Sequence, residues 1–139
     1  MEAQQKKIIP CILAIITNEK GEVLFQKRND PGSPAHDKWE FPGGGMEFGE
    51  TPEQTLVREA KEETGYDVEI IRLLPKIYSN TWPEAQVLLI AYECKIKSGE
   101  YRKQDLEVSE GKFALPSEMD YSEALPYVKE IAELLSPKF

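Results

Sequence analysis

The sequence is poor in features that would place it in several other protein classes. It has only two cysteines, and none of its apolar runs reaches the ~18 residues that a membrane span requires. Lysine and arginine number 17 against 25 aspartate and glutamate residues, which gives a formal net charge of −8 at pH 7. Nucleic-acid polymers and anionic membranes attract clustered positive charge, so neither is an expected partner.

The remaining composition is that of an ordinary globular protein. With 139 residues, 40% hydrophobic and 30% charged, we expect a single domain spanning residues 1–139. Cys11 and Cys94 both lie in apolar stretches and are expected to be core residues rather than a disulfide framework. The first residues, MEAQQKKIIP, lack the apolar core of a signal peptide, so a cytoplasmic protein is expected. The oligomeric state stays open between a monomer and a homodimer.

Apolar runs and turn residues predict a mixed sheet with helices. Residues 8–16 form a continuous apolar run typical of a strand buried on both faces, and residues 22–27 would return as the second strand of a hairpin. Further strands are expected at 39–41, 67–77, 85–96 and 107–113, with loops at 28–38 and 78–84 and a turn at 98–99. A last helix is expected from Pro116 to the C-terminus. This order predicts an α/β sandwich around a mixed sheet.

A helix at Pro52–Thr64 has sequence signals at both ends. Thr51 suits the N-cap, and Gln54 would complete a capping box with it. Gly65 is expected to end the helix in the left-handed conformation. The segment before the helix, PGGGMEFGE, is predicted to be a glycine-rich loop. The packed side of the helix is predicted to include Leu56, Val57 and Ala60.

Three glutamates are placed unfavourably on this helix. Glu59, Glu62 and Glu63 share one stripe near its C-terminal end, where like charges repel by roughly 0.2–0.5 kcal/mol per pair and oppose the helix dipole. A divalent cation would turn that repulsion into shared coordination, and carboxylate oxygens suit Mg²⁺ or Mn²⁺. Arg58, four residues before Glu62, could neutralise or orient one carboxylate. Taken alone, the segment would be expected to be a solvated acidic face, which is the usual role of such a run.

The surrounding pattern favours the metal site. From Gly44 to Tyr66 the chain reads G-x5-E-x7-R-E-A-x-E-E-x-G-Y, which resembles the Nudix box, the signature of the Nudix hydrolase family. Ala60 and Tyr66 stand where that box prefers an aliphatic residue. The stretch FPGGGMEFGETPEQTLVREAKEETG is most similar to MutT-type nucleoside triphosphate pyrophosphohydrolases. The resemblance implies a Nudix-type α/β/α sandwich, with the catalytic loop and helix at residues 43–64.

The resemblance also implies a reaction. It predicts a Mg²⁺-dependent hydrolase, with Mn²⁺ as an alternative ion, that cleaves the diphosphate linkage of a small nucleotide. The leading expectation is a (deoxy)nucleoside triphosphate cleaved to monophosphate and pyrophosphate. ADP-ribose, a nucleotide sugar or a dinucleoside polyphosphate is the alternative substrate. A non-catalytic nucleotide-binding module is the alternative function.

Site residues follow from the same resemblance. The implied metal ligands are Glu59, Glu62, Glu63 and the backbone carbonyl of Gly43. Arg58 would orient Glu59 by an ion pair. Glu59 is the expected general base or water-orienting group, and Arg58, Glu59 and Glu62 are the implied catalytic residues.

Other carboxylates could join this site. Glu50 matches the first glutamate of the box and would either hold the loop against the helix or assist a metal. A later carboxylate is expected from Glu107 or Glu110. Strand alternation puts these two on opposite faces, so only one should point at the metal.

Substrate contacts have weaker signals. Arg28, at the end of the second expected strand, could reach a phosphate bidentately, or it could be a surface residue. An aromatic wall for the base is expected from Trp39, Phe41, Tyr78 and Trp82, although core packing is favoured for Phe41. MutT-type enzymes that act on oxidised guanine read the base with an asparagine near the start of the last helix. Here that region reads EALPYVKE, with Leu125 or a neighbour in its place, which counts against that preference.

Overall fold

A mixed β-sheet forms the centre of the computed structural model, which describes residues 5–104 and 106–135. The main path of the sheet runs through β3 (Trp39–Glu40), β2 (Val23–Arg28), β1 (Lys7–Thr17), β7 (Ala85–Gly99) and β5 (Tyr66–Leu73). The strands off this path are β4 (Gly43–Gly45) on β1, β6 (Tyr78–Thr81) on β7 and β8 (Val108–Ala114) on β2. β1 and β7 are parallel and all other paired strands are antiparallel, so the sheet is mixed as predicted.

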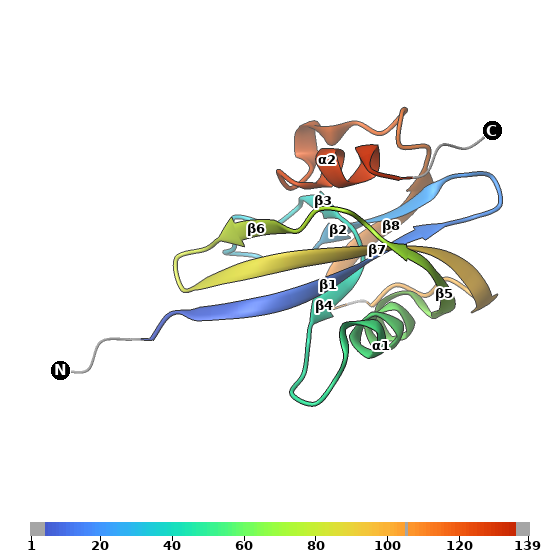
Figure 1. Ribbon diagram of the computed structural model, residues 1–139. Helices are drawn as coiled ribbons and strands as arrows, with labels where there is room; N and C mark the ends of the chain where they lie inside the picture. Colours follow the sequence, from blue (N-terminus) through green and yellow to red (C-terminus); the bar gives the residue numbers. More distant parts are fainter. Residues whose placement is uncertain (1–4, 105, 136–139) are drawn as a thin grey trace.

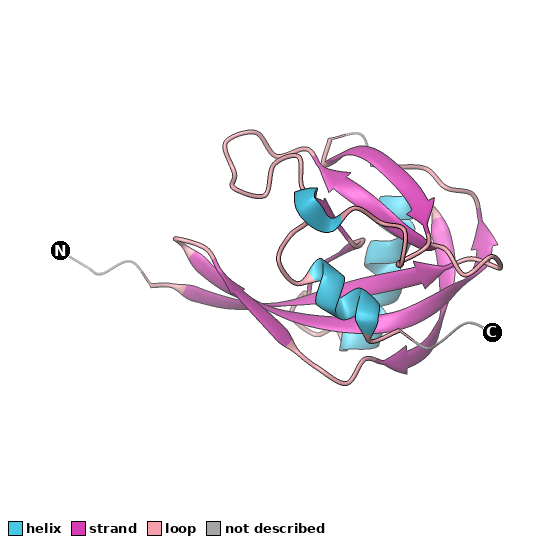
Figure 2. Cartoon of the chain, turned by 90° about the horizontal axis from the view of Figure 1, so that it is seen from above, coloured by secondary structure: helices cyan, strands magenta, loops and turns pink. Residues whose placement is uncertain are grey.

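Two helices cover opposite faces of this sheet. In Figure 1, α1 (Pro52–Thr64) lies below the strands and α2 (Val128–Glu133) lies above them. Figure 2, seen from above, shows the helical segments lying across the strands. Successive side chains of β1 point to opposite faces, so Ile12, Ala14 and Ile16 join the core of α1 while Leu13 and Ile15 join that of α2. The predicted α/β sandwich is therefore confirmed.

The bounds of α1 agree with the prediction. The N–H of Gln54 donates to the Thr51 side chain at 3.2 Å, and the Thr51 N–H donates to the Gln54 side chain at 2.9 Å, which completes the capping box. Gly65 ends the helix with a φ of 81°, a conformation that glycine adopts without steric cost. Val57 is 42% exposed, so its predicted packing was wrong. The buried residues of α1 are Thr55, Leu56, Ala60 and Thr64.

Several strands differ from their predicted extents. β4 lies inside the expected glycine-rich loop, because Gly43 and Gly45 pair with Leu13 and Cys11 of β1. β6 occupies the start of the expected loop at 78–84. β5 stops at Leu73 rather than continuing to residue 77. β7 continues through the expected turn at 98–99, because pairing with β5 extends it to Gly99.

The C-terminal segment holds two short helical pieces instead of one long helix. A 3₁₀ turn at Tyr121–Glu123 precedes α2, and the two are separated by Pro126. Proline has no N–H to donate, so it cannot lie in a helix interior without breaking the hydrogen-bond pattern. Residues 136–139 of the predicted helix lie outside the described residues. Within the described part of the chain, no helix is both long and apolar enough to cross a membrane.

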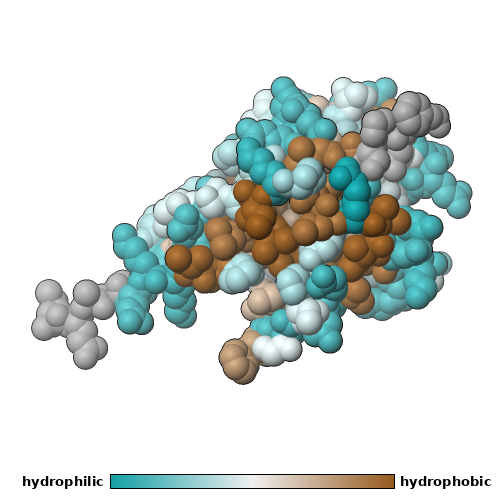
Figure 3. Space-filling view, viewed as in Figure 1, coloured by the Kyte–Doolittle hydropathy of each residue, from teal (hydrophilic) through white to brown (hydrophobic). Residues whose placement is uncertain are grey.

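Some apolar side chains remain at the surface. Ile8 at the start of β1 is 66% exposed, so the burial predicted for the whole run begins only at Ile12. Ile71, Leu73 and Ile77, in β5 and the segment after it, are also exposed. Figure 3 shows apolar surface gathered on the face where Figure 1 places β5, β6 and β7.

Candidate active site

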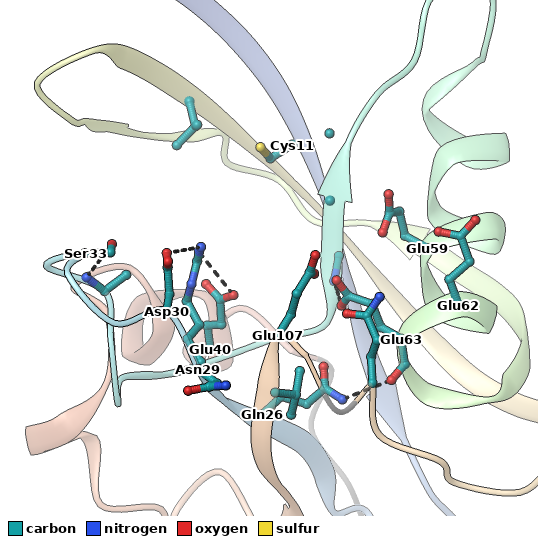
Figure 4. A pocket seen from close by; sticks show the side chains of 18 of the residues that line it. Cys11, Gln26, Asn29, Asp30, Ser33, Glu40, Glu59, Glu62, Glu63 and Glu107 are labelled. Atoms are coloured by element: carbon teal, nitrogen blue, oxygen red, sulfur yellow. Dashed lines mark hydrogen bonds and ion pairs between the residues drawn. The ribbon is translucent and has the colours of Figure 1, made fainter.

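A cavity of about 680 Å³ lies beside the glycine strand β4 and the exposed stripe of α1. In Figure 4, Glu59, Glu62 and Glu63 stand on the α1 side of this cavity, while Asp30 and Glu40 stand on the opposite side. The side chain of Glu107 projects between the two groups. The cavity therefore has a carboxylate side, formed mainly by α1, and a second side formed by β2, β3 and the loop after β2.

Arg58 ties the carboxylate side together. Its Nη1 donates to Glu59 at 2.9 Å and to Glu62 at 3.3 Å. Its Nε and Nη2 donate to Glu50 at 2.7 and 2.9 Å. The side chain of Arg58 is 26% exposed, so these ion pairs are only partly screened by water. The predicted ion pair between Arg58 and Glu59 is thus present in the structure.

Glu50 lies outside the cavity lining and anchors the loop that precedes α1. It accepts hydrogen bonds from Arg58, from the Thr55 hydroxyl at 3.0 Å and from the Glu47 N–H at 2.9 Å. These donors, Arg58 first among them, lower the pKa of Glu50 to about 2. Glu50 was predicted either to hold the loop against the helix or to assist a metal, and these contacts favour the first role.

The glycine strand packs closely against two of the glutamates. The Gly43 N–H donates to the Glu63 carboxylate at 3.0 Å. Burial raises the pKa of Glu63 to about 8, helped by repulsion from Glu59, Glu40 and Glu107. Burial also raises the pKa of Glu59, against the opposing effect of Arg58. Both carboxylates therefore lie in a setting that penalises their negative charge until a cation joins them.

The two later carboxylates separate as alternation predicts. Glu107, which immediately precedes β8, lines the cavity, and its charge raises the pKa of both Glu59 and Glu63. Glu110 lies on β8 opposite Lys27, is exposed, and does not line the cavity. The structure therefore brings Glu107, and not Glu110, to the carboxylates of α1.

The opposite side of the cavity contains a polar network that the sequence analysis missed. The side chain of Glu40 is only 19% exposed, and it pairs with Arg28 at 3.5 Å. The hydroxyl of Tyr127 donates to Glu40 at 3.1 Å, and Arg28 also pairs with Asp30 at 3.3 Å. Burial raises the pKa of Glu40, although Arg28 and Tyr127 oppose this. Arg28 reaches the cavity as predicted, but its guanidinium is already engaged by two carboxylates.

The sequence model of the NUDIX domain matches residues 7–136, nearly the whole chain. This chain belongs to the Nudix hydrolase family. A MutT-like protein of Streptomyces ambofaciens is 31% identical over 124 residues, which cover 89% of this Nudix chain and 75% of that protein. The solved structure of a MutT protein from Methanosarcina mazei shares the fold, with a TM-score of 0.81, 23% identity and 94% of each chain covered.

Two other relatives match over shorter stretches. An RNA pyrophosphohydrolase of Acinetobacter baylyi is 43% identical over 65 residues, 47% of this chain and 36% of that protein. The 8-oxo-dGTP diphosphatase of Escherichia coli is 41% identical over 71 residues, 51% of this chain and 54% of that protein. The chain thus spans about a third and about half of these relatives. It is a Nudix hydrolase that is similar to a MutT-like protein over most of its length and to RNA pyrophosphohydrolases over a shorter stretch.

Nudix hydrolases generally use divalent metal ions, and the carboxylate side has the chemistry to hold one. Hard carboxylate and carbonyl oxygens are the ligands that Mg²⁺ and Mn²⁺ prefer. Among the described residues, however, no three acidic, histidine or cysteine side chains stand close enough to form a ready metal site. Arg58 holds Glu59 and Glu62, and the Gly43 N–H holds Glu63. The donor set therefore fits a divalent ion, provided that these side chains turn toward one another.

The aromatic wall predicted for this Nudix site is mostly absent from the cavity lining. Trp82 lines the cavity, together with the apolar Val87. Trp39 and Phe41 are buried in the core beside α2, and Tyr78 packs against the same core. These three side chains pack in or against the core on the face that α2 covers, and none of them lines the cavity.

Proposed function

We propose that this Nudix hydrolase is a Mg²⁺-dependent enzyme that cleaves a (deoxy)nucleoside triphosphate to the monophosphate and pyrophosphate. The observation that carries the proposal is that Glu59, Glu62, Glu63 and Glu107 line one side of a single cavity. An acidic lining would repel a polyphosphate, so this side needs a cation to accept one. The opposite side, where Arg28 pairs with Glu40 and Asp30, leaves room for the nucleoside.

Glu59, Glu62 and Glu63 would hold the ion, together with the backbone carbonyl of Gly43, and Mn²⁺ could replace Mg²⁺. A bound divalent ion supplies charge neutralisation for the phosphates and for the transition state. Arg58 holds the Glu59 carboxylate, which accepts a proton from the attacking water.

The second side of the cavity would hold the nucleoside. Trp82 and Val87 provide apolar surface for a ring, and the polar edge of the cavity includes Glu40 with its partner Arg28. Leu125, which stands near the place of the asparagine of MutT-type enzymes, is 5% exposed and donates its N–H to the Trp39 carbonyl. It offers no side-chain amide, so we propose that oxidised guanine is not the preferred base.

Other substrates keep the same chemistry. ADP-ribose or a nucleotide sugar would yield two monophosphates instead of pyrophosphate, and a dinucleoside polyphosphate would yield two nucleotides that share its phosphates. The similarity to an RNA pyrophosphohydrolase over 65 residues makes the 5′-triphosphate end of an RNA a further candidate. The net charge of −8 counts against it, because a polymer needs positive surface along its backbone. The alternative function is a module that binds a nucleotide without cleaving it. The chain keeps all the glutamates of the Nudix box, which counts against this alternative.

A nucleotide panel with Mg²⁺, read by product mass, tests the proposal. It should contain nucleoside triphosphates, ADP-ribose, a nucleotide sugar, a dinucleoside polyphosphate and a 5′-triphosphate oligonucleotide. Glu63→Gln should lose most turnover, whereas Glu110→Gln, a matched glutamate outside the cavity, should keep it. Equal activity in the two variants would contradict the metal assignment. Tight binding of a nucleotide without turnover would favour the binding module.

A further inference from the structure

A buried oxygen atom in the cavity lacks a partner. Gln104, in the segment between β7 and β8, lines the cavity, and its side-chain oxygen Oε1 is buried. It is the one buried side-chain polar atom in the described part of the chain that accepts or donates no hydrogen bond. Buried acceptors are rarely left unpaired, because the lost hydration is then not replaced. Such an atom beside a cavity points to a donor that arrives with a ligand.

No side chain in the described part of the chain supplies that donor in the structure. Gln26 directs its amide N–H groups to the Tyr101 hydroxyl at 3.0 Å and to the Glu63 carbonyl at 3.4 Å. Glu107 is a carboxylate, which only accepts hydrogen bonds when it is ionised. The cavity around Gln104 is therefore rich in acceptors, and a further acceptor there is useful only to a ligand that carries protons.

Gln104 belongs to the turn that carries Glu107. Its backbone carbonyl accepts hydrogen bonds from the N–H groups of Glu107 at 3.3 Å and of Val108 at 3.0 Å. One turn thus holds Gln104 beside Glu107, whose charge acts on Glu59 and Glu63. The unpaired oxygen therefore belongs to a residue that lines the same cavity as the implied metal ligands.

We propose that Oε1 of Gln104 accepts a hydrogen bond from a water molecule carried by the divalent ion and so positions that water. The inference rests on the metal site of the proposed function. Mg²⁺ dehydrates reluctantly and usually keeps several waters when it binds to protein, and each water that it polarises is a strong donor. Gln104 is thus a positioning residue, acting through water rather than on the ion.

Titration calorimetry of Mg²⁺ into the metal-free protein, without nucleotide, tests this role. Gln104→Met removes the acceptor and nearly keeps the size of the side chain, and it should raise the Kd for Mg²⁺ by about 10-fold. The Tm of the metal-free variant should stay equal or rise, because an unpaired carbonyl is replaced by an apolar group. Gln86→Met, on β7 and outside the cavity lining, is the matched control and should change neither value.

Other outcomes would overturn the inference. An unchanged Kd for Mg²⁺ in Gln104→Met would do so, and so would a raised Kd accompanied by a clear fall in the metal-free Tm, which would show a structural role. Weaker binding only of a non-hydrolysable nucleoside triphosphate, with the Mg²⁺ Kd unchanged, would assign the oxygen to the nucleotide instead. If Gln104→Met does not fold, Gln104→Ala takes its place. Glu63→Gln in the same titration separates the two claims: if it keeps Mg²⁺ binding, the proposed metal site itself fails.

Discussion

The carboxylate of Glu59 lies directly against the backbone of Gly44. A Cβ at residue 44 would come within 2.5 Å of the Glu59 carboxyl carbon and 2.6 Å of both its oxygens. Only glycine leaves space for this approach, because any other residue would push the carboxylate away. The glycine strand therefore fixes where the proposed proton acceptor stands.

Gly44→Ala should accordingly displace Glu59 and lower turnover, by about 10²-fold if the carboxylate moves on the order of 1 Å. Gly45→Ala is a suitable control, because a Cβ there would meet only the Ile9 side chain at 3.7 Å. Steady-state kinetics of the two variants, with Tm as a check on folding, measures the difference. Similar activity in both would mean that the contact at residue 44 does not position Glu59.

Tyr127→Phe should destabilise the protein by about 1–3 kcal/mol, since the largely buried Glu40 would lose a hydrogen-bond donor. Chemical denaturation measures this directly. Tyr121→Phe is the comparison, because its hydroxyl donates to the Pro116 carbonyl rather than to a carboxylate, and it should cost less. If Tyr127→Phe lowers the free energy of unfolding no more than Tyr121→Phe does, Arg28 alone is a sufficient partner for the Glu40 carboxylate.

The metal-free protein should become less stable as the pH rises from about 5.5 to about 8.5. The folded-state pKa of Glu63 is raised to about 8 from 4.5, so the folded protein binds more protons than the unfolded chain in this window. The contribution of Glu63 to the free energy of unfolding is complete below pH 4.5 and is lost as the pH rises through about 8. Glu50, with its lowered pKa, titrates below this range. Thermal unfolding in a chelator should therefore show a flatter pH profile for Glu63→Gln; identical profiles would refute the assignment.

Glu59→Gln and Glu62→Gln should lower activity without destabilising the metal-free protein. Burial penalises the charge of Glu59, while an amide oxygen in its place can still accept from Arg58. The Glu62 side chain is 55% exposed, so its replacement should change stability by less than about 0.5 kcal/mol. Paired Tm and turnover measurements in the presence and absence of Mg²⁺ test this. A large loss of metal-free stability in both variants would show that the stripe serves the fold.

The sequence predicts the structure best where local chemistry decides it. The bounds of α1 follow from the Thr51–Gln54 box and Gly65, which satisfy the backbone groups at the two helix ends. β4 could not be predicted, because three glycines carry no side-chain pattern and only pairing with β1 makes them a strand. Val57 shows the same limit: it is apolar and next to the buried Leu56, but it is 42% exposed, and the sequence alone does not show where the packed face ends.

The residues of the candidate site also separate into those that local sequence patterns predict and those that they do not. The stripe of Glu59, Glu62 and Glu63 is visible because helical spacing places these residues together. Glu40 had one usable signal: Trp39 before it is buried in the core, so alternation turns Glu40 to the other face. Tyr127 and Gln104 had none, because tertiary contacts from distant segments bring them to the cavity network.

The most direct test of the central claim is the identity of the products formed from a nucleoside triphosphate in the presence of Mg²⁺. Nucleoside monophosphate and pyrophosphate should appear in a one-to-one ratio, and neither should form with a chelator or with Glu63→Gln. Nucleoside diphosphate and orthophosphate, or unaltered turnover in Glu63→Gln, would contradict the account.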